Sequence, residues 1–209
     1  MPPSPGRPRR ASQELLQEAA FELFQLRGYR STSVEQIANT AGFSRATFFN
    51  FFASKAELFW LETDALIAAL RDFLEQRLGD PDPPSLDEAL LSYADTMNSS
   101  AIPWALQNFR LIEATDDLIA SGAGRVLGLT GLFRDYLGRS AAADPAADPA
   151  TDPAADSAVL NARAAVTTSL VLVALLAWID AGVGRGGFRD HLARALSQGV
   201  PPSTGHLSW

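Results

Sequence analysis

The stretch that decides the fold is "SVEQIANTAGFSRATFF", residues 33–49. Ser33 and Gln36 stand at the N-cap and third positions of a helix, where their side chains form a capping box. Gly42 can take the positive φ of a tight turn, and Ser44 can cap a second, short helix. Two helices joined by a short turn containing glycine predict a helix-turn-helix. The second helix of such a motif presents its first residues to the major groove of DNA.

Helical patterns continue on both sides of this motif. Apolar spacing predicts a helix over residues 12–27 and further helices from Ser54 to near Gln198, and no segment alternates in the manner of a strand. The fold class is therefore all-α, with a three-helix DNA-binding domain followed by a C-terminal helical domain. The predicted organisation is a basic flexible arm at 1–11, a helix-turn-helix domain at 12–56, a helical domain at 57–200 and a tail at 201–209.

One segment interrupts the second domain. Residues 141–156, "AAADPAADPATDPAAD", alternate Asp-Pro pairs with alanine. Each proline removes a backbone donor and biases the preceding residue away from helix. We expect a flexible linker here, with a functional acidic segment as the alternative.

The composition of the chain indicates the compartment in which it folds. The 209 residues are 47% apolar and include no cysteine, which suits a reducing cytoplasm. The longest apolar run, residues 164–179, holds two threonines and is shorter than the ~20 residues of a bilayer span. It predicts a buried helix and no membrane segment.

Charge divides the chain unevenly. Residues 1–60 carry seven basic and five acidic side chains, whereas the remainder carries ten basic and nineteen acidic ones. The net charge of −7 argues against a wholly basic nucleic-acid binder, but the asymmetry predicts different partners for the two parts.

The residues around the motif extend the pattern. Residues 15–58, "LLQEAAFELFQLRGYRSTSVEQIANTAGFSRATFFNFFASKAEL", resemble the TetR family of transcriptional regulators (TetR/AcrR-like). The resemblance implies a regulator, more often a repressor than an activator, that binds a palindromic operator in double-stranded DNA as a homodimer. It also implies a C-terminal domain that dimerises and binds an unknown small-molecule effector, with no cofactor, no metal and no catalysis.

The resemblance further implies DNA contacts. Base-reading positions fall on Arg45 and Ala46, and phosphate-contacting positions on Ser33, Thr47, Asn50 and Lys55. Lys55 is the only lysine in the chain. A surface charge beside Glu57 is the alternative reading of it.

Four more residues near the motif leave alternatives open. Phe49 and Phe51 stand where the family often has tyrosine and histidine, so neither can hydrogen-bond a phosphate. Phe49 can still meet a thymine methyl, and Phe51 can simply fill space. Arg9 and Arg10 belong to the predicted arm, which either reaches the minor groove or phosphates or is solvated.

The C-terminal domain offers candidates for ligand binding and dimerisation. The candidate ligand-binding residues are Tyr93, Met97, Trp104, Phe109, Glu113 and Trp178, each of which could instead serve as plain core, or in the case of Glu113 pair with Arg110. The candidate interface residues are Leu172, Leu175 and Leu176 in the apolar helix, and Leu192 and Leu196 in the last helix.

Two other functions compete with this reading. An enzyme is disfavoured because the chain has two histidines, no cysteine, and no nucleophile motif, phosphate loop or metal spacing. A helical ligand-binding protein with weak or lost DNA binding is the stronger alternative, because the residues at 49 and 51 cannot hydrogen-bond phosphates.

Overall fold

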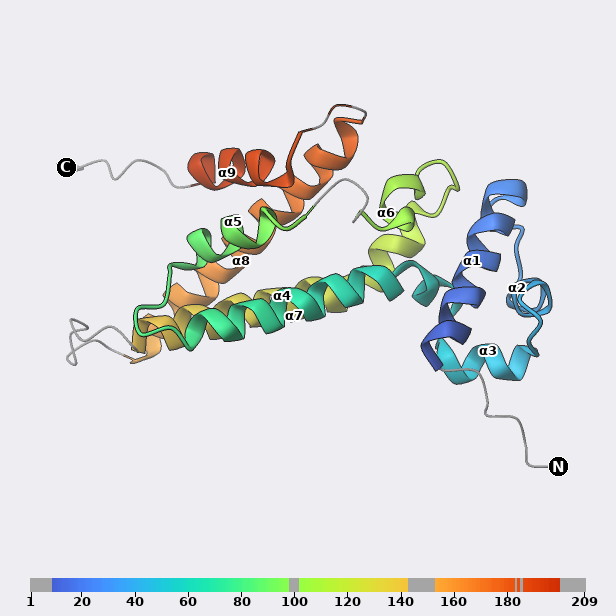
Figure 1. Cartoon of the computed structure of the whole chain (residues 1–209), viewed down its shortest axis with the longest axis horizontal. Helices are drawn as coiled ribbons and strands as arrows, with labels where there is room; N and C mark the ends of the chain where they lie inside the picture. Colours follow the sequence, from blue (N-terminus) through green and yellow to red (C-terminus); the bar gives the residue numbers. More distant parts are fainter. Residues whose placement is uncertain (1–8, 98–101, 143–152, 183, 185, 200–209) are drawn as a thin grey trace. The chain divides into compact units, whose positions relative to one another are not determined.

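The structure is a computed structural model that describes residues 9–97, 102–142, 153–182, 184 and 186–199. Across these residues every regular element is helical, which confirms the predicted fold class (Figure 1). The elements are α1 (Arg9–Arg27), α2 (Val34–Thr40), α3 (Arg45–Phe51), the 3₁₀ turn η1 (Lys55–Phe59), α4 (Leu61–Leu78), α5 (Leu86–Ala94), α6 (Trp104–Asn108), α7 (Thr115–Ala142), α8 (Pro153–Asp180) and α9 (Phe188–Gly199).

The chain forms two compact units. The N-terminal unit comprises Met1–Leu66 and Pro103–Ala123, and the C-terminal unit comprises Ile67–Ile102 and Gly124–Trp209. This division differs from the predicted boundary after residue 56, because a later segment joins the N-terminal unit. Ile112 and Leu118 from that segment are buried in the same hydrophobic cluster as α1.

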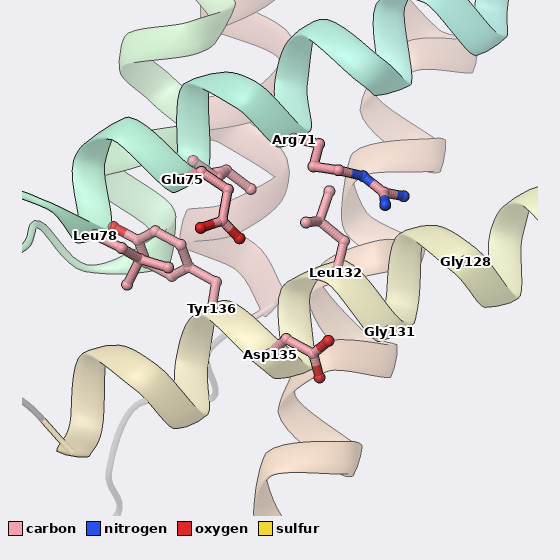
Figure 2. Close-up of a pocket in the computed structure, with 9 residues that line it drawn as sticks. Arg71, Glu75, Leu78, Gly128, Gly131, Leu132, Asp135 and Tyr136 are labelled. Atoms are coloured by element: carbon pink, nitrogen blue, oxygen red, sulfur yellow. The ribbon is translucent and has the colours of Figure 1, made fainter.

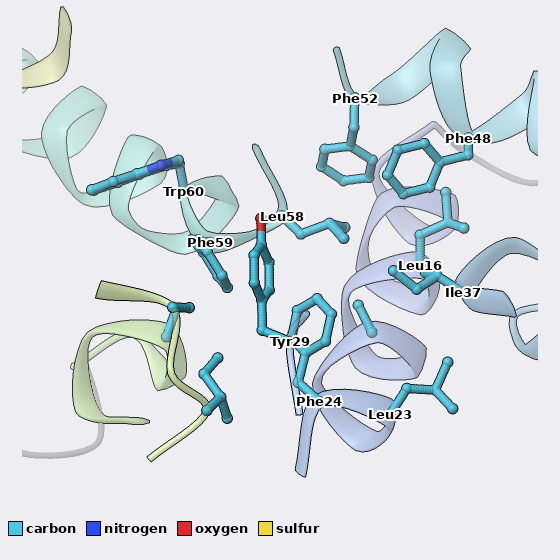
Figure 3. Close-up of a cluster of buried hydrophobic side chains, with 14 of the residues drawn as sticks. Leu16, Leu23, Phe24, Tyr29, Ile37, Phe48, Phe52, Leu58, Phe59 and Trp60 are labelled. Atoms are coloured by element: carbon cyan, nitrogen blue, oxygen red, sulfur yellow. The ribbon is translucent and has the colours of Figure 1, made fainter. Parts of the chain in front are cut away.

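Aromatic rings dominate the core of the N-terminal unit. Phe24 on α1 lies edge-on to Tyr29 at 5.1 Å, and Tyr29 lies 5.0 Å from Phe59 of η1. Figure 3 shows these rings between α1 and the turn that follows the helix-turn-helix. Phe48, from the middle of α3, is fully buried in the same cluster, so the core holds α3 in place.

The C-terminal unit is built on the packing of α8 against α9, with α5 also against α9. The fully buried Trp178 of α8 lies 5.2 Å from Phe188 of α9, and its indole donates to the Gly186 carbonyl at 3.0 Å. Leu192 and Leu196 of α9 are buried in this packing. The two α9 leucines that were candidates for the dimer interface are therefore buried within their own subunit.

Two predicted flexible segments are partly helical. α1 begins at Arg9, so the final residues of the expected arm form a helical turn. α7 continues to Ala142 and α8 begins at Pro153, so both ends of the expected linker, residues 141–156, are helical. Proline suits the first turn of a helix, where its missing N–H has no intrahelical partner to lose. The remaining linker residues, 143–152, and the predicted tail lie outside the described residues.

A tight turn separates α6 from α7. The helix that starts after Pro103 ends at Asn108, and Glu113 adopts a positive φ of 54° in the turn that follows. α7 starts at Thr115 with Asp116 and Asp117 in its first turn, where acidic side chains complement the helix dipole.

Candidate nucleic-acid interface

The helix-turn-helix is held by the local contacts that its sequence predicts. The Ser33 hydroxyl accepts from the Gln36 amide at 3.2 Å, while the Ser33 amide donates to the Gln36 side chain at 2.8 Å. Gly42 takes a φ of +77° between the helices. Ser44 then caps α3 by accepting from the Thr47 amide at 3.0 Å. The predicted motif is therefore present with both caps and its glycine turn.

α3 presents a solvent-accessible polar face. Arg45, Ala46 and Asn50 are exposed, and Ser33 is exposed at the start of α2. Thr47 is partly buried, and its hydroxyl lies 2.9 Å from that of Ser44. With Phe48 buried behind it, α3 has one face in the core and the other open for a DNA groove.

Arginines lie over both of the unusual phenylalanines. The Arg45 guanidinium is 5.0 Å from the ring centre of Phe49, whose side chain is 43% exposed. The Arg9 guanidinium is 5.4 Å from the ring centre of Phe51, and its Nη2 donates to the Asn50 carbonyl at 3.4 Å. Arg9 therefore bridges the start of α1 and the end of α3, which differs from the free arm that was predicted. Arg10 instead pairs with Glu14 at 3.0 Å along the surface of α1.

Lys55 is an internal anchor of the N-terminal unit. Its Nζ donates to the carbonyls of Tyr29 at 2.6 Å and Thr32 at 2.9 Å, and lies 3.8 Å from the Tyr29 ring centre. Burial lowers the pKa of Lys55, and the Asp117 carboxylate opposes that change. These contacts replace the alternative of a solvated charge beside Glu57, because the ammonium faces the turn between α1 and α2. An ammonium has three donors, so one remains for a phosphate.

A second anchor ties the start of α7 to the same turn. Burial, and then the charge and hydrogen bond of Asp117, raise the pKa of Tyr29. The Tyr29 amide donates to the Ile112 carbonyl at 3.3 Å. The Trp60 indole donates to the Ser121 hydroxyl at 2.8 Å. No local sequence pattern predicts these contacts, because they join positions far apart in the chain.

Comparison with known proteins agrees with this geometry. Residues 16–60 match the model of bacterial regulatory proteins of the tetR family, and they cover α2 and α3, the turn η1 and most of α1. Residues 16–60 of the chain are therefore similar to the DNA-binding region of the tetR family.

One curated relative matches about half of the chain. MftR of Mycobacterium tuberculosis, proposed as the transcriptional regulator of mycofactocin biosynthesis, is 31% identical over 118 residues. That match spans 55% of this chain and 58% of MftR, so the chain covers little more than half of this curated relative.

A solved structure shares the helical fold. FadR of Thermus thermophilus, a TetR-family transcriptional repressor in complex with lauroyl-CoA, aligns with a TM-score of 0.56 and 22% identity, covering 93% of this chain and all of FadR. NalD of Pseudomonas aeruginosa, the secondary repressor of the MexAB-OprM efflux pump, aligns with a TM-score of 0.49 and 21% identity over 93% of this chain and 99% of NalD.

The six predicted ligand-binding residues are divided between the units. Trp104 stacks on Phe21 at 4.3 Å, and Phe109 packs on the cluster of the N-terminal unit. Trp178 is fully buried inside the C-terminal unit. The rings of these three aromatic residues make packing contacts, as the alternative reading as core expects, and their role in ligand binding stays a prediction. Tyr93 and Met97 are partly buried in the C-terminal unit, and Glu113 is exposed in the N-terminal one.

A pocket of about 280 Å³ lies instead between α4 and α7. Figure 2 shows Arg71 and Glu75 extending from α4 toward α7, which contributes Leu132 and Tyr136. The full lining is Arg71, Leu74, Glu75, Leu78, Gly128, Gly131, Leu132, Asp135 and Tyr136. None of the six predicted ligand-binding residues belongs to it.

Charges around this pocket are mostly paired. Arg139 donates to both carboxylate oxygens of Glu75 at 2.7 and 2.8 Å, and Arg134 donates to Asp135 at 2.8 Å. Within the described residues Arg71 makes no ion pair or hydrogen bond through its side chain. The pocket therefore combines leucine side chains with one uncompensated cation.

α8 carries an apolar face that its own subunit leaves open. Val159, Val166 and Val173 are 56%, 50% and 60% exposed, and Leu176 is 44% exposed. Ala162 and Ser169, which lie between them on the same stripe, are also exposed. Leu172 and Leu175 are partly buried. By length and composition alone, Ser157–Asp180 would pass as a membrane span, a test that core helices of soluble proteins also pass.

Proposed function

We propose that the protein is a DNA-binding transcriptional regulator, most directly a repressor that a small-molecule effector releases from its operator. The observation that carries this proposal is the exposed face of α3, with Arg45 and Asn50 accessible beside a capped turn and a buried Phe48. A guanidinium can bond the O6 and N7 atoms of guanine, and such contacts specify sequence. The tetR-family match over residues 16–60 supports the same reading.

The contacts divide into two kinds. Arg45 and Ala46 are proposed to face bases, while Ser33, Thr47, Asn50 and Lys55 are proposed to meet phosphates. For Lys55 the contact would use the one donor that the carbonyls of Tyr29 and Thr32 leave unused. Lys55 would then hold the turn and the DNA backbone together.

The operator is proposed to be a palindrome read by a homodimer. The exposed stripe on α8 supports this, because Val159, Val166 and Val173 repeat every seven residues and Leu176 follows three later. Apolar residues at spacings of seven and three form the seam between paired helices. Two recognition helices in such a dimer would bind half-sites about 34–36 Å apart, one turn of DNA. With a DNA target, the protein is proposed to act in the cytoplasm.

The effector is proposed to bind in the C-terminal unit. The pocket between α4 and α7 supports this with its leucine side chains and the unpaired charge of Arg71. An effector that binds one conformation of the dimer better than another shifts the population toward it, and lowers operator affinity when that conformation spaces the half-sites differently.

Fluorescence anisotropy with the DNA upstream of the gene, over a series of salt concentrations, tests the proposal. Wild-type protein should prefer this DNA to random duplex, with a log–log salt slope near −0.9 for each phosphate contact. Arg45→Ala should lose about 1–3 kcal/mol of discrimination at one base position per half-site. Lys55→Ala should weaken binding to all duplexes and lower the slope by about 1.

The same titration tests the alternative function, a ligand-binding protein without specific DNA binding. A ligand-binding protein of this fold that has lost DNA binding would bind specific and random duplexes with the same weak, salt-dependent affinity. That result would overturn the proposal, and a preference for the upstream DNA would exclude the rival.

A further inference from the structure

Phe49 occupies an unusual position for a large apolar side chain. It lies on the open face of α3, and 43% of the residue remains exposed. The buried Phe48 ring packs edge-on against it, with ring centres 5.4 Å apart at an interplanar angle of 80°. The Arg45 guanidinium lies 5.0 Å from the Phe49 ring centre.

This spacing is a property of the helix. Residues 45 and 49 are four apart, so their side chains are neighbours on one face. Arginine is weakly hydrated and planar, and it stacks on aromatic faces without giving up its outward-facing donors. A ring held by Phe48 therefore limits the rotamers of Arg45 while leaving its N–H groups available.

Phe51 stands in the same relation to Arg9. The ring is partly buried against the core cluster, and the Arg9 guanidinium lies 5.4 Å from its centre. One donor of Arg9 bonds the Asn50 carbonyl at 3.4 Å, and the remaining donors are exposed. Both phenylalanines that depart from the family's usual residues thus lie beneath an exposed arginine.

We propose that Phe49 is a specificity-determining platform that orients the Arg45 guanidinium toward a base edge, and that Phe51 is the matching platform that orients Arg9 toward the DNA backbone. This inference rests on the proposed function. In free solution a long arginine side chain samples many rotamers, and binding must immobilise it. A ring that immobilises it beforehand raises affinity without touching DNA, and replaces the hydrogen bond that tyrosine or histidine would supply.

A double-mutant cycle at Phe49 and Arg45 tests the first platform. Phe49→Leu keeps an apolar side chain and removes the π face, whereas Phe49→Tyr keeps the face. Phe49→Leu should lower discrimination at the base that Arg45 reads by about 2–5-fold, the range expected of an exposed cation–π contact. In the Arg45→Ala background the same change should have no further effect, and Phe49→Tyr should retain discrimination in the presence of Arg45.

An equal loss from Phe49→Leu in both backgrounds would overturn the platform. It would show that the ring itself contacts DNA, for example at a thymine methyl. Wild-type protein that shows no base discrimination would overturn the proposed function instead, so the two failures are distinguishable.

A measurement without DNA keeps the platform testable in that case too. Ring currents of Phe49 should shift the NMR resonances of the Arg45 side chain in the free dimer, and Phe49→Leu should return them to the values of an unstacked arginine. Unchanged resonances in Phe49→Leu would overturn the platform.

The role of Phe51 is tested by whether its replacement changes overall DNA affinity or base discrimination. Phe51→Leu should weaken binding to all duplexes equally and reduce the salt slope as Arg9→Ala does, with no change in base discrimination. Loss of discrimination at one base, or an undiminished salt slope, would overturn the role given to Phe51.

Discussion

The two units of this chain complete their cores to different degrees. In the N-terminal unit the rings of Phe24, Tyr29 and Phe59 contact one another, and every one of them is buried within a single subunit. In the C-terminal unit Trp178 and Phe188 are equally well buried, but α8 leaves its valine stripe open. The core beneath the proposed DNA-reading surface is thus closed within one subunit. The α8 stripe, which we propose as the dimer interface, keeps apolar area exposed.

The largest expected effect comes from breaking the open face. Leu176→Arg places a charge on the stripe, and burying an unpaired charge in an interface is costly. We expect monomers and an operator affinity lower by about 10²–10⁴-fold, because each half-site loses its tethered partner. Light scattering and anisotropy on full and half operators measure this.

Leu127→Arg is the matched control for that variant. Leu127 is a 73% exposed leucine of the same unit that lies on α7 rather than on the stripe. It should leave the dimer and operator binding intact. A stable Leu176→Arg dimer with wild-type operator affinity would place the interface away from α8.

The second prediction compares a substitution in the buried core of the N-terminal unit with one on the exposed stripe of α8. Phe59→Ala removes a fully buried ring of the N-terminal unit and should lower the free energy of unfolding by about 3–5 kcal/mol at any protein concentration. Val173→Ala, on the exposed stripe, should change the stability of the subunit by less than about 0.5 kcal/mol. It should act through dimer dissociation, so its effect should depend on concentration.

Urea denaturation at two protein concentrations distinguishes the effects of Phe59→Ala and Val173→Ala. A concentration-dependent effect of Phe59→Ala would show that the N-terminal core is not closed within one subunit.

Two glycines of α7 give a smaller contrast. A Cβ built on Gly122 would lie 2.8 and 2.9 Å from atoms of the Trp60 indole, whereas a Cβ on Gly124 would meet nothing within 4 Å. Gly122→Ala should cost about 1–3 kcal/mol, because the ring is held by its bond to Ser121 and cannot move freely. Gly124→Ala should instead stabilise the protein by about 0.5–1 kcal/mol through helix propensity.

Thermal melting of the two variants decides this comparison. Equal melting temperatures would mean that Trp60 moves aside without cost.

The smallest expected effect is on alkaline stability. Burial raises the pKa of all three tyrosines, Tyr29, Tyr93 and Tyr136, with the Asp117 carboxylate adding to the rise at Tyr29. The neutral phenol is thus favoured in the folded state. This contribution to stability is complete below the unfolded pKa near 10 and is lost as the pH rises beyond it.

Tyrosines of the two units can be compared by melting between pH 8 and pH 11. Tyr29→Phe should make the alkaline loss of stability shallower, and more so than Tyr93→Phe, because Asp117 adds to the effect at Tyr29 alone. The reverse order would contradict the contact between Tyr29 and Asp117.

Much of the candidate DNA-facing site could be predicted because its signals are local. Ser33, Gln36, Gly42 and Ser44 lie within twelve residues, and each acts on backbone groups next to it in the chain. The helical class follows for the same reason, because apolar period and caps are local. The candidate contacts at Arg45, Ala46, Thr47 and Asn50 stay predictions of the same kind, now placed on or beside an exposed face.

The tertiary structure decided what depends on partners distant in the sequence. Lys55 bonds carbonyls 23 and 26 residues away, and those bonds make it an anchor of the turn. Trp104 joins the N-terminal core through Phe21, although its sequence surroundings place it in the second domain. α8 is apolar almost all round in sequence, and only its packing on α9 shows which side remains open. Periodicity states how much apolar surface a helix must bury, whereas the choice of neighbour is made by side chains that meet only after the chain has folded.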